Sequence, residues 1–239
     1  MNDFVRHGID VSVHNGNVNW KAVARTCDFA IIRAGFGKNN IDSKAKANIA
    51  GCEQYGINFG VYWFSYAYTE EMARKEARYL VEFLGNKKPT YPLYFDFEYD
   101  SASFARSKGI VVTGTLVRKL ATAFCDELEK LGYYAGIYCN GDYAKNIYND
   151  GILDRYDVWY ADWSGDKPDR ECNLWQNSSS GSVEGVSGKV DTNIAFVDYP
   201  AIIKKAGLNG YGPEPVEKPD DKSFTCPHGC PYCPHSKKD

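Results

Sequence analysis

Hydrophobic and polar residues alternate along this chain in blocks that predict strands and helices in turn. Short apolar runs rich in β-branched and aromatic residues are typical of buried strands. They lie at residues 8–12, 29–35, 59–66, from 93 onward, 134–139 and 157–163. Segments with helical spacing or composition separate them, at residues 20–25, 42–55, 69–84 and 117–131. We expect a loop over residues 101–113.

The helices between strands end after residue 163. Two short strand-like pieces at 174–177 and 189–193 are joined by a Ser/Gly-rich turn, and a closing helix is expected over 196–206. Strands that alternate with helices indicate an α/β fold with a parallel sheet, and about eight strands suit closure into a barrel. An open doubly wound sheet is the alternative, but no glycine-rich phosphate loop follows the first strand.

The composition suits one large domain. The chain has 239 residues, 44% of them hydrophobic, with 18 tyrosines and 5 tryptophans whose rings suit sugar faces as well as cores. The net charge of −3 and the absence of a basic block predict no nucleic-acid partner and no membrane partner. The oligomeric state is not predicted by any of these features.

The N-terminus and the cysteines both favour a cytoplasmic origin. Residues 1–7 lack the apolar run of a secretion signal, so we expect synthesis in the cytoplasm without a recognisable signal peptide. A processed, secreted form is the alternative. The cysteines of the main body are odd in number and lie mostly in apolar stretches: Cys27, Cys52, Cys125, Cys139 and Cys172. We predict buried free thiols rather than a disulfide framework.

Candidate chemistry is concentrated in the stretch Tyr94 to Asp100, where three carboxylates interrupt a run of large aromatic residues. Asp96 and Glu98 are two residues apart, so in a strand they share one face. Two carboxyl groups against aromatic walls repel each other, which leaves one protonated and one ionised. Glycoside hydrolysis uses this division of labour. The alternatives are an exposed acidic strand end or a divalent metal site with oxygen ligands.

A barrel would gather acids from distant parts of the chain. The functional face of such a barrel is the carboxyl end of its strands. Asp10, Asp96, Glu98 and Asp191 are all expected near strand carboxyl ends, and would meet at one mouth. Aromatic residues would line this mouth: Tyr62, Phe64, Tyr138, Trp163 and Trp175. Each aromatic residue, taken alone, is equally consistent with core packing.

The ordered motifs of the chain resemble those of glycoside hydrolase family twenty-five, the Chalaropsis-type lysozymes that include many phage endolysins. The motifs are Gly8-Ile9-Asp10-Val11-Ser12, Phe29 to Ala34, Gly60-Val61-Tyr62, Asp96-x-Glu98, Trp159 to Trp163, and Val190-Asp191-Thr192-Asn193. The resemblance covers residues 8 to about 206. It implies an irregular, TIM-like barrel with five β/α units followed by three strands, and a catalytic domain over residues 1–210.

The resemblance also implies an activity, cleavage of the β-1,4 bond between N-acetylmuramic acid and N-acetylglucosamine in bacterial peptidoglycan. Glu98 matches the general acid/base and Asp96 its partner carboxylate, while Asp10 and Asp191 match two further active-site acids. Asp96 either attacks the anomeric carbon or orients the substrate's own N-acetyl oxygen, and the family favours the second route with retention. No cofactor is expected for catalysis. The enzyme would reach the cell wall after release, as endolysins do, or after secretion.

Other residues and functions remain open at this point. Tyr62, Phe64, Tyr138, Trp163 and Gln176 are candidates for stacking on or hydrogen-bonding to sugars, and Arg33 for contacting substrate or neutralising the acids. Asp10 and Asp191 either tune the catalytic pair or form purely structural hydrogen bonds. The alternative functions are an inactive wall-binding or phage structural module, and a glycosidase acting on chitin-like glycans, since fold alone does not fix function.

The C-terminal residues depart from the family pattern. Residues 211–225 are rich in proline and acidic residues, which predicts a stiff linker. Residues 226–239 carry Cys226, Cys230 and Cys233 with His228 and His235. Closely spaced thiolates and imidazoles suit a structural zinc site, in which three cysteines and His235 or His228 supply the ligands. An iron–sulfur cluster and a reactive or disulfide-forming tail are the alternatives.

Overall fold

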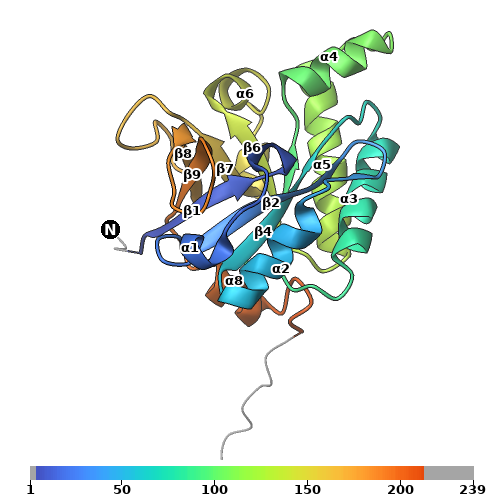
Figure 1. Cartoon of the computed structure of the whole chain (residues 1–239). Helices are drawn as coiled ribbons and strands as arrows, with labels where there is room; N and C mark the ends of the chain where they lie inside the picture. The colour runs from blue at the N-terminus through green and yellow to red at the C-terminus, as the bar shows by residue number, and fades with distance from the viewer. Residues whose placement is uncertain (1–3, 213–239) are drawn as a thin grey trace, which may run out of the picture.

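The computed structural model describes residues 4–212, and it shows a closed barrel of eight strands surrounded by helices (Figure 1). The barrel strands are β1 (Arg6–Val11), β2 (Phe29–Phe36), β4 (Asn58–Phe64), β5 (Leu93–Asp96), β6 (Ala135–Asn140), β7 (Asp157–Ala161), β8 (Leu174–Gly181) and β9 (Val190–Ala195). A short strand, β3 (Asn40–Ile41), pairs with β2 alone. The prediction of a closed barrel is therefore confirmed, and the open sheet is wrong.

The strands run parallel from β1 through β8, and β9 closes the barrel by pairing antiparallel with both β8 and β1. This reversal corrects the prediction for Asp191, which was expected near the carboxyl end of its strand. Asp191 is the second residue of β9. Because β9 is antiparallel, its amino end lies at the same mouth as the carboxyl ends of the other strands, and Asp191 faces Asp10 across the β1–β9 pair.

Helices cover the barrel along β1 to β6 and are missing between β7, β8 and β9, as predicted. They are α1 (Trp20–Val23), α2 (Ala45–Tyr55), α3 (Glu70–Leu84), α4 (Tyr99–Ser107), α5 (Gly114–Lys130), α6 (Gly141–Asn146), α7 (Ile152–Arg155) and α8 (Tyr199–Ala206), with a 3-10 turn, η1, at Val13–Asn15. The side chains of Asn19 and Thr69 cap α1 and α3. Figure 1 shows α4 and α6 at one end of the barrel and α8 at the other.

The loop expected over residues 101–113 is wrong in its first half, because α4 covers residues 101–107. This helix begins directly after Glu98, whose backbone N–H donates to the hydroxyl of Ser101 at 3.1 Å. Ala102 and Ala105 are its buried apolar residues. So few apolar positions leave little periodicity to read in the sequence, whereas the local cap and two small packing residues are enough to form the helix.

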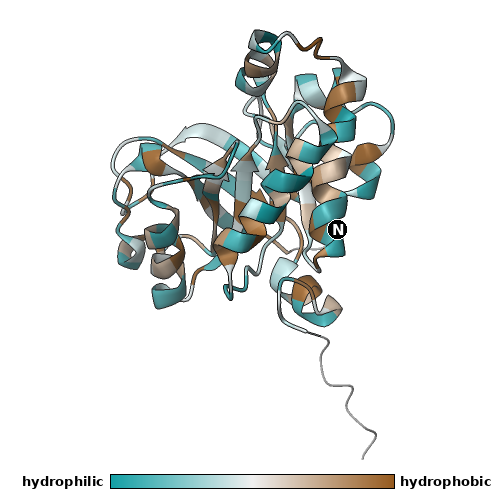
Figure 2. Ribbon diagram, turned by 90° about the vertical axis from the view of Figure 1, so that its right-hand side faces the viewer, coloured by the Kyte–Doolittle hydropathy of each residue, from teal (hydrophilic) through white to brown (hydrophobic). Residues whose placement is uncertain are grey.

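The core has two layers. One fills the barrel interior and contains Phe29, Tyr94, Trp159 and Leu174, with Tyr199 and Ile203 of α8 closing the amino end. The other lies between the strands and the helices and contains Val61, Trp63, Leu80, Phe95 and Phe124. The helices accordingly carry both hydrophilic and hydrophobic residues (Figure 2). Glycines make room inside, since a Cβ at Gly8 or Gly136 would lie within 2.5 Å of the ring of Phe29 or Tyr94.

The five cysteines of the barrel are unpaired, with Cys52, Cys125 and Cys139 buried and Cys27 and Cys172 half-buried. Among residues 4–212, no helix has both the length and the apolar character needed to cross a membrane. The predicted linker at 211–225 lies almost wholly outside the described residues. The predicted zinc ligands Cys226, Cys230, Cys233 and His235 lie outside them altogether.

Candidate active site

Four carboxyl groups gather at the mouth of the barrel. Asp96 is the last residue of β5, and Glu98 follows it two residues later at the start of α4. Asp10 lies in β1 and is paired in register with Asp191 of β9. Asp96 and Asp10 are buried, whereas Glu98 and Asp191 are half-buried. Strand geometry thus brings together four residues that are up to 181 positions apart in the sequence (191 minus 10).

The Asp96–Glu98 pair has strongly perturbed proton affinity. Burial is the main cause that raises the pKa of Asp96 well above its usual range, and the charges of Glu98 and then Asp10 add to it. Burial also raises the pKa of Glu98; a hydrogen bond with Asp96 opposes this rise, and the charges of Asp100 and Asp191 add to it. Because the two carboxyl groups interact directly, the protonation of one depends on the protonation of the other.

Asp96 has an unused hydrogen-bonding atom. Its Oδ1 is buried and has no hydrogen-bond partner among the described residues. Buried polar atoms normally have a hydrogen-bond partner, because a buried donor or acceptor without one costs about 1–3 kcal/mol. The backbone of Asp96 is well fixed, because its carbonyl accepts the N–H of Ser65 at 2.7 Å. The unpartnered oxygen is therefore held at a defined position at the barrel mouth.

Asp10, in contrast, is bound by a network of amides. Its Oδ2 accepts from Asn193 Nδ2 at 2.8 Å and from Gln176 Nε2 at 2.9 Å. The Oε1 of Gln176 accepts from the hydroxyl of Tyr138 at 3.1 Å, and Nε2 also lies 3.4 Å from Asp191 Oδ2. Burial, followed by the charge of Asp191, raises the pKa of Asp10 to about 8. The network links the two outer acids to Tyr138.

Asn193 and Trp159 belong to this network and were not identified as site residues from the sequence. Trp159 Nε1 donates to Asn193 Oδ1 at 2.8 Å, which leaves the amide group of Asn193 turned toward Asp10. Asn193 is two residues after Asp191, so strand periodicity alone could have placed both on the same face. The donor role of Trp159 has no such signal, because it depends on a strand that is distant in sequence.

The predicted aromatic residues divide into four groups. Tyr62 and Tyr138 pack edge-on against Trp159, with their ring centres 5.6 and 4.7 Å from its ring. Burial raises the pKa of both hydroxyls well above their usual range, and the charges of the nearby acids add to this rise. Phe64 is paired in register with Asp96 at the end of β4. Trp163, two residues beyond β7, is 57% exposed.

The fourth group, Trp175, is a correction. Trp175 was expected to line the mouth, but it is paired in register with Tyr160, which packs in the outer core layer. Its neighbours in β8, Leu174 and Gln176, belong to the barrel interior, so alternation along the strand points Trp175 outward. Its indole N–H donates to the backbone carbonyl of Asp162 at 2.7 Å. Trp175 therefore supports the β7–β8 connection.

Arg33 is held by a buried acid that the sequence analysis did not single out. Arg33 Nε donates to Asp42 Oδ2 at 2.8 Å. Asp42 also accepts the backbone N–H groups of Val13 and Lys44, at 2.9 and 2.8 Å. The positive charge of Arg33 opposes the rise in the pKa of Asp96. The structure thus supports the interpretation of Arg33 as a cation that partly neutralises the acids.

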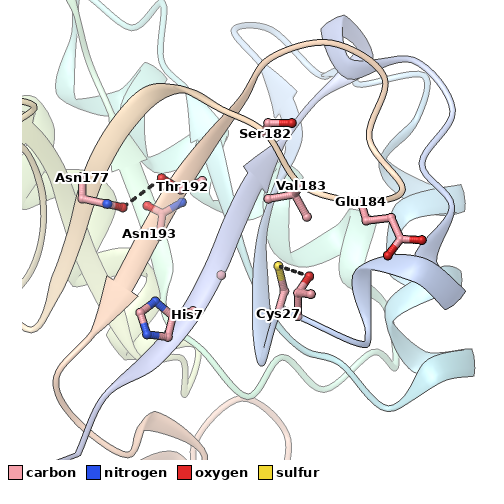
Figure 3. A pocket seen from close by; sticks show the side chains of 10 residues that line it. His7, Cys27, Asn177, Ser182, Val183, Glu184, Thr192 and Asn193 are labelled. Carbon is pink, nitrogen blue, oxygen red and sulfur yellow. Dashed lines mark hydrogen bonds between the residues drawn. The ribbon is translucent and has the colours of Figure 1, made fainter.

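A separate pocket of about 370 Å³ lies between β1 and the segment that follows β8 (Figure 3). Its lining includes His7, Cys27, Asn177, Glu184 and Thr192, and none of the four acids. Within the described range, no three His, Cys, Asp or Glu side chains are grouped as metal ligands.

A barrel of this topology, with two interacting carboxyl groups at the carboxyl end of its strands, has the arrangement that glycoside hydrolases use. The family model described as "Glycosyl hydrolases family 25" matches residues 9–186. The chain belongs to this family, which confirms the resemblance found in its motifs.

Relatives and solved structures agree with this assignment. Lysozyme M1 of Streptomyces globisporus is 27% identical over 203 residues, covering 78% of this chain and 66% of that protein. The uncharacterized protein YegX of Escherichia coli K12 is 26% identical over 210 residues, and the match covers 80% of this chain and 73% of YegX. The autolysin LytC of Streptococcus pneumoniae, solved with a synthetic peptidoglycan ligand, superposes with a TM-score of 0.70 at 25% identity. The match covers 80% of this chain and 47% of LytC, so the chain spans about half of that modular protein.

Proposed function

We propose that this chain is an N-acetylmuramidase, which hydrolyses the β-1,4 bond between N-acetylmuramic acid and N-acetylglucosamine in bacterial peptidoglycan. The observation that carries this proposal is the coupled Asp96–Glu98 pair at the barrel mouth, with Asp96 Oδ1 buried and unpartnered. Membership of glycosyl hydrolase family 25 and similarity to a Streptomyces lysozyme support the same substrate. The enzyme acts on the wall after release from the cell or after secretion.

Glu98 serves as the general acid and then as the general base. It is the less buried member of the pair and lies at the start of α4, where the glycosidic oxygen can reach it. Its raised pKa favours the protonated form that a leaving oxygen requires. In the first step Glu98 gives its proton to that oxygen, and in the second step it takes a proton from the attacking water.

Asp96 serves to orient the substrate's N-acetyl group. The unpartnered Oδ1 can accept the acetamido N–H, and the acetamido oxygen then attacks the anomeric carbon as the glycosidic bond breaks. Water later opens the resulting cyclic intermediate, so configuration is retained, as in the known substrate-assisted exceptions to the two-carboxylate scheme. The N–H donor stabilises the Asp96 anion, and the proton of the pair is thereby left on Glu98.

Asp10 and Asp191 support this pair from the opposite side of the mouth. Asp10 is fixed by Asn193 and Gln176, and its negative charge raises the pKa of Asp96. Asp191 contributes to the raised pKa of Glu98 in the same way. Tyr62, Phe64, Tyr138 and Trp163 are the aromatic residues at this end of the barrel that can contact the sugar rings.

The proposal is tested by comparing wild-type protein with Glu98→Gln on purified Gram-positive cell walls, with turbidity and reducing ends measured together. The substitution keeps the shape of the side chain and removes its proton, so activity should fall about a hundredfold or more. Glu82→Gln, on the exposed side of α3, is the control and should retain full activity.

Two further assays distinguish the muramidase from its alternatives: cleavage of chitin oligomers tests for a glycosidase on another glycan, and wall binding tests for an inactive binding module. Faster cleavage of chitin oligomers than of cell walls would assign the barrel to another glycan. Binding of walls by both proteins, with no reducing ends released by either, would make the barrel a binding module. The muramidase assignment requires release of reducing ends from walls by wild type alone.

A further inference from the structure

Glu76 is a buried carboxyl group that the catalytic scheme does not use. It lies in the middle of α3, on the side that faces the barrel, and is 2% exposed. Among residues 4–212 it takes part in no ion pair, although its neighbours Glu70 and Glu71 pair with cations on the helix surface. Burial without a cation raises the pKa of Glu76 to about 8, so the group is held by hydrogen bonds and not by an opposite charge.

Those partners belong to the turn that follows β4. Glu76 Oε2 accepts the hydroxyl of Ser65 at 2.6 Å, and Oε1 accepts the backbone N–H of Tyr66 at 3.0 Å. The Ser65 hydroxyl in turn accepts the N–H of Ala67 at 3.2 Å. One side chain on α3 therefore fixes three consecutive residues of this turn.

The same turn holds the catalytic segment at two points. The N–H of Ser65 donates to the backbone carbonyl of Asp96 at 2.7 Å. The ring of Tyr66 packs against Phe104 of α4, with ring centres 4.9 Å apart, and α4 is the helix that begins after Glu98. The turn thus contacts the chain at Asp96 itself and again beyond Glu98, on either side of Glu98.

We propose that Glu76 is a positioning residue for the Asp96–Glu98 pair. It fixes the Ser65–Ala67 turn, and the turn fixes the spacing between the two catalytic carboxyl groups. This inference rests on the proposed hydrolytic function of the pair. Glu76 does not touch the substrate side of the barrel mouth, so its effect falls on the chemical step and leaves binding unchanged. Misplacement of reacting groups by about 1 Å can cost about a hundredfold in rate.

The test measures kcat and KM on soluble peptidoglycan fragments for four variants. Glu76→Ala should lower kcat about tenfold to a hundredfold with KM changed less than about threefold, because it releases the turn without altering the sugar contacts. Glu76→Gln keeps an acceptor oxygen for Tyr66 and a polar group for Ser65, and should recover most of the wild-type kcat. Ser65→Ala removes only the hydroxyl link and should lower kcat several-fold. Glu82→Ala is the matched control on the same helix.

Melting temperatures are measured in parallel, and all rates are taken well below the lowest of them. If Glu76→Ala does not fold, Ser65→Ala carries the same test, since it leaves the backbone donor to Asp96 in place. A folded Glu76→Ala or Ser65→Ala variant with wild-type kcat overturns the inference, even where its melting temperature falls. An inactive wild-type protein overturns the proposed function instead, so the two failures are distinguishable.

Discussion

Two buried aspartates at opposite ends of the same barrel have opposite surroundings. Asp157, at the start of β7, accepts four hydrogen bonds, from the hydroxyls of Tyr199, Tyr94 and Tyr134 at 2.6, 3.3 and 3.4 Å and from Asn173 at 3.0 Å. Asp96, at the end of β5, has an unpartnered oxygen and a second acid beside it.

The difference shows what separates a structural buried acid from a reactive one. Burial raises the pKa of both side chains, but the four donors around Asp157 oppose it and the pKa rises only to about 6. At Asp96 no donor compensates, the charge of Glu98 adds to burial, and the pKa rises well above the usual range. At the amino end of the barrel, the protein's own residues supply the hydrogen bonds of the buried aspartate. At the carboxyl end, the buried aspartate retains an unused acceptor oxygen for a substrate.

Asp96→Asn is expected to have the largest effect on activity. The amide cannot stabilise positive charge on the substrate's N-acetyl group, so kcat should fall about a hundredfold or more. Stability should be unchanged or higher, because the substitution removes repulsion with Glu98. Steady-state rates and thermal unfolding check both expectations, and a variant within tenfold of wild-type kcat would contradict the role given to Asp96.

Asp157→Ala should have the reverse profile. Removing the carboxylate takes the acceptor from four donors, of which those on Tyr94 and Tyr199 are buried, so the free energy of unfolding should fall by about 3 kcal/mol. The kcat of the folded fraction should stay close to wild type, because Asp157 lies at the end of the barrel away from the catalytic pair. Denaturant unfolding measures the loss, with exposed Asp154→Ala on α7 as the control. A large loss of kcat in folded Asp157→Ala would refute the division between the two ends.

Stability should decrease as pH rises from about 4 to about 8. Asp157 and Asp10 have folded pKa values raised to about 6 and about 8, above their unfolded value of 3.8, so the folded state binds the extra protons. Their contribution is complete below the unfolded pKa and is lost as pH rises through the folded values. Asp10→Asn should remove about 2 kcal/mol of the decline between pH 6 and pH 8. Melting temperatures across this range test the sign, and an equally steep decline in the variant would contradict it.

Trp163→Ala should have the smallest effect. The side chain is 57% exposed beyond β7, so its removal costs the fold little. Loss of an aromatic surface for a sugar ring should raise KM about threefold to tenfold with kcat unchanged. Initial rates over a range of substrate concentration separate the two parameters. An unchanged KM would exclude Trp163 from the substrate contacts.

Much of the fold was predictable from local sequence signals. The apolar strand runs, the helix caps at Asn19 and Thr69 and the loss of helices after β7 all depend on neighbouring residues. The helix α4 was missed because it has few apolar positions, although the bond from the Glu98 N–H to the Ser101 hydroxyl is a local cap. The direction of β9 was also missed, since strand orientation is not encoded in strand periodicity.

The candidate site was predictable in its acids and less so in their partners. Asp96 and Glu98 were expected on one face of a strand, but β5 ends at Asp96 and Glu98 caps α4, so the two acids are close because they are near in sequence and not because they share a strand face. The bonds from Asn193 to Asp10 and from Asp42 to Arg33 join distant segments, and only the closed barrel brings them together. Trp175 was predicted on the wrong face of its strand. It is the second residue of β8, so only one strand residue precedes it to show which positions point inward and which point outward.

The most direct test of the central claim identifies the sugar at each new reducing end. Purified peptidoglycan is digested with wild-type protein, the products are reduced with borohydride, and the resulting sugar alcohols are separated after acid hydrolysis. Cleavage by the Asp96–Glu98 pair as proposed predicts muramitol in the wild-type digest and its absence in the Glu98→Gln digest. Glucosaminitol in place of muramitol, or muramitol at equal levels in both digests, would contradict the account.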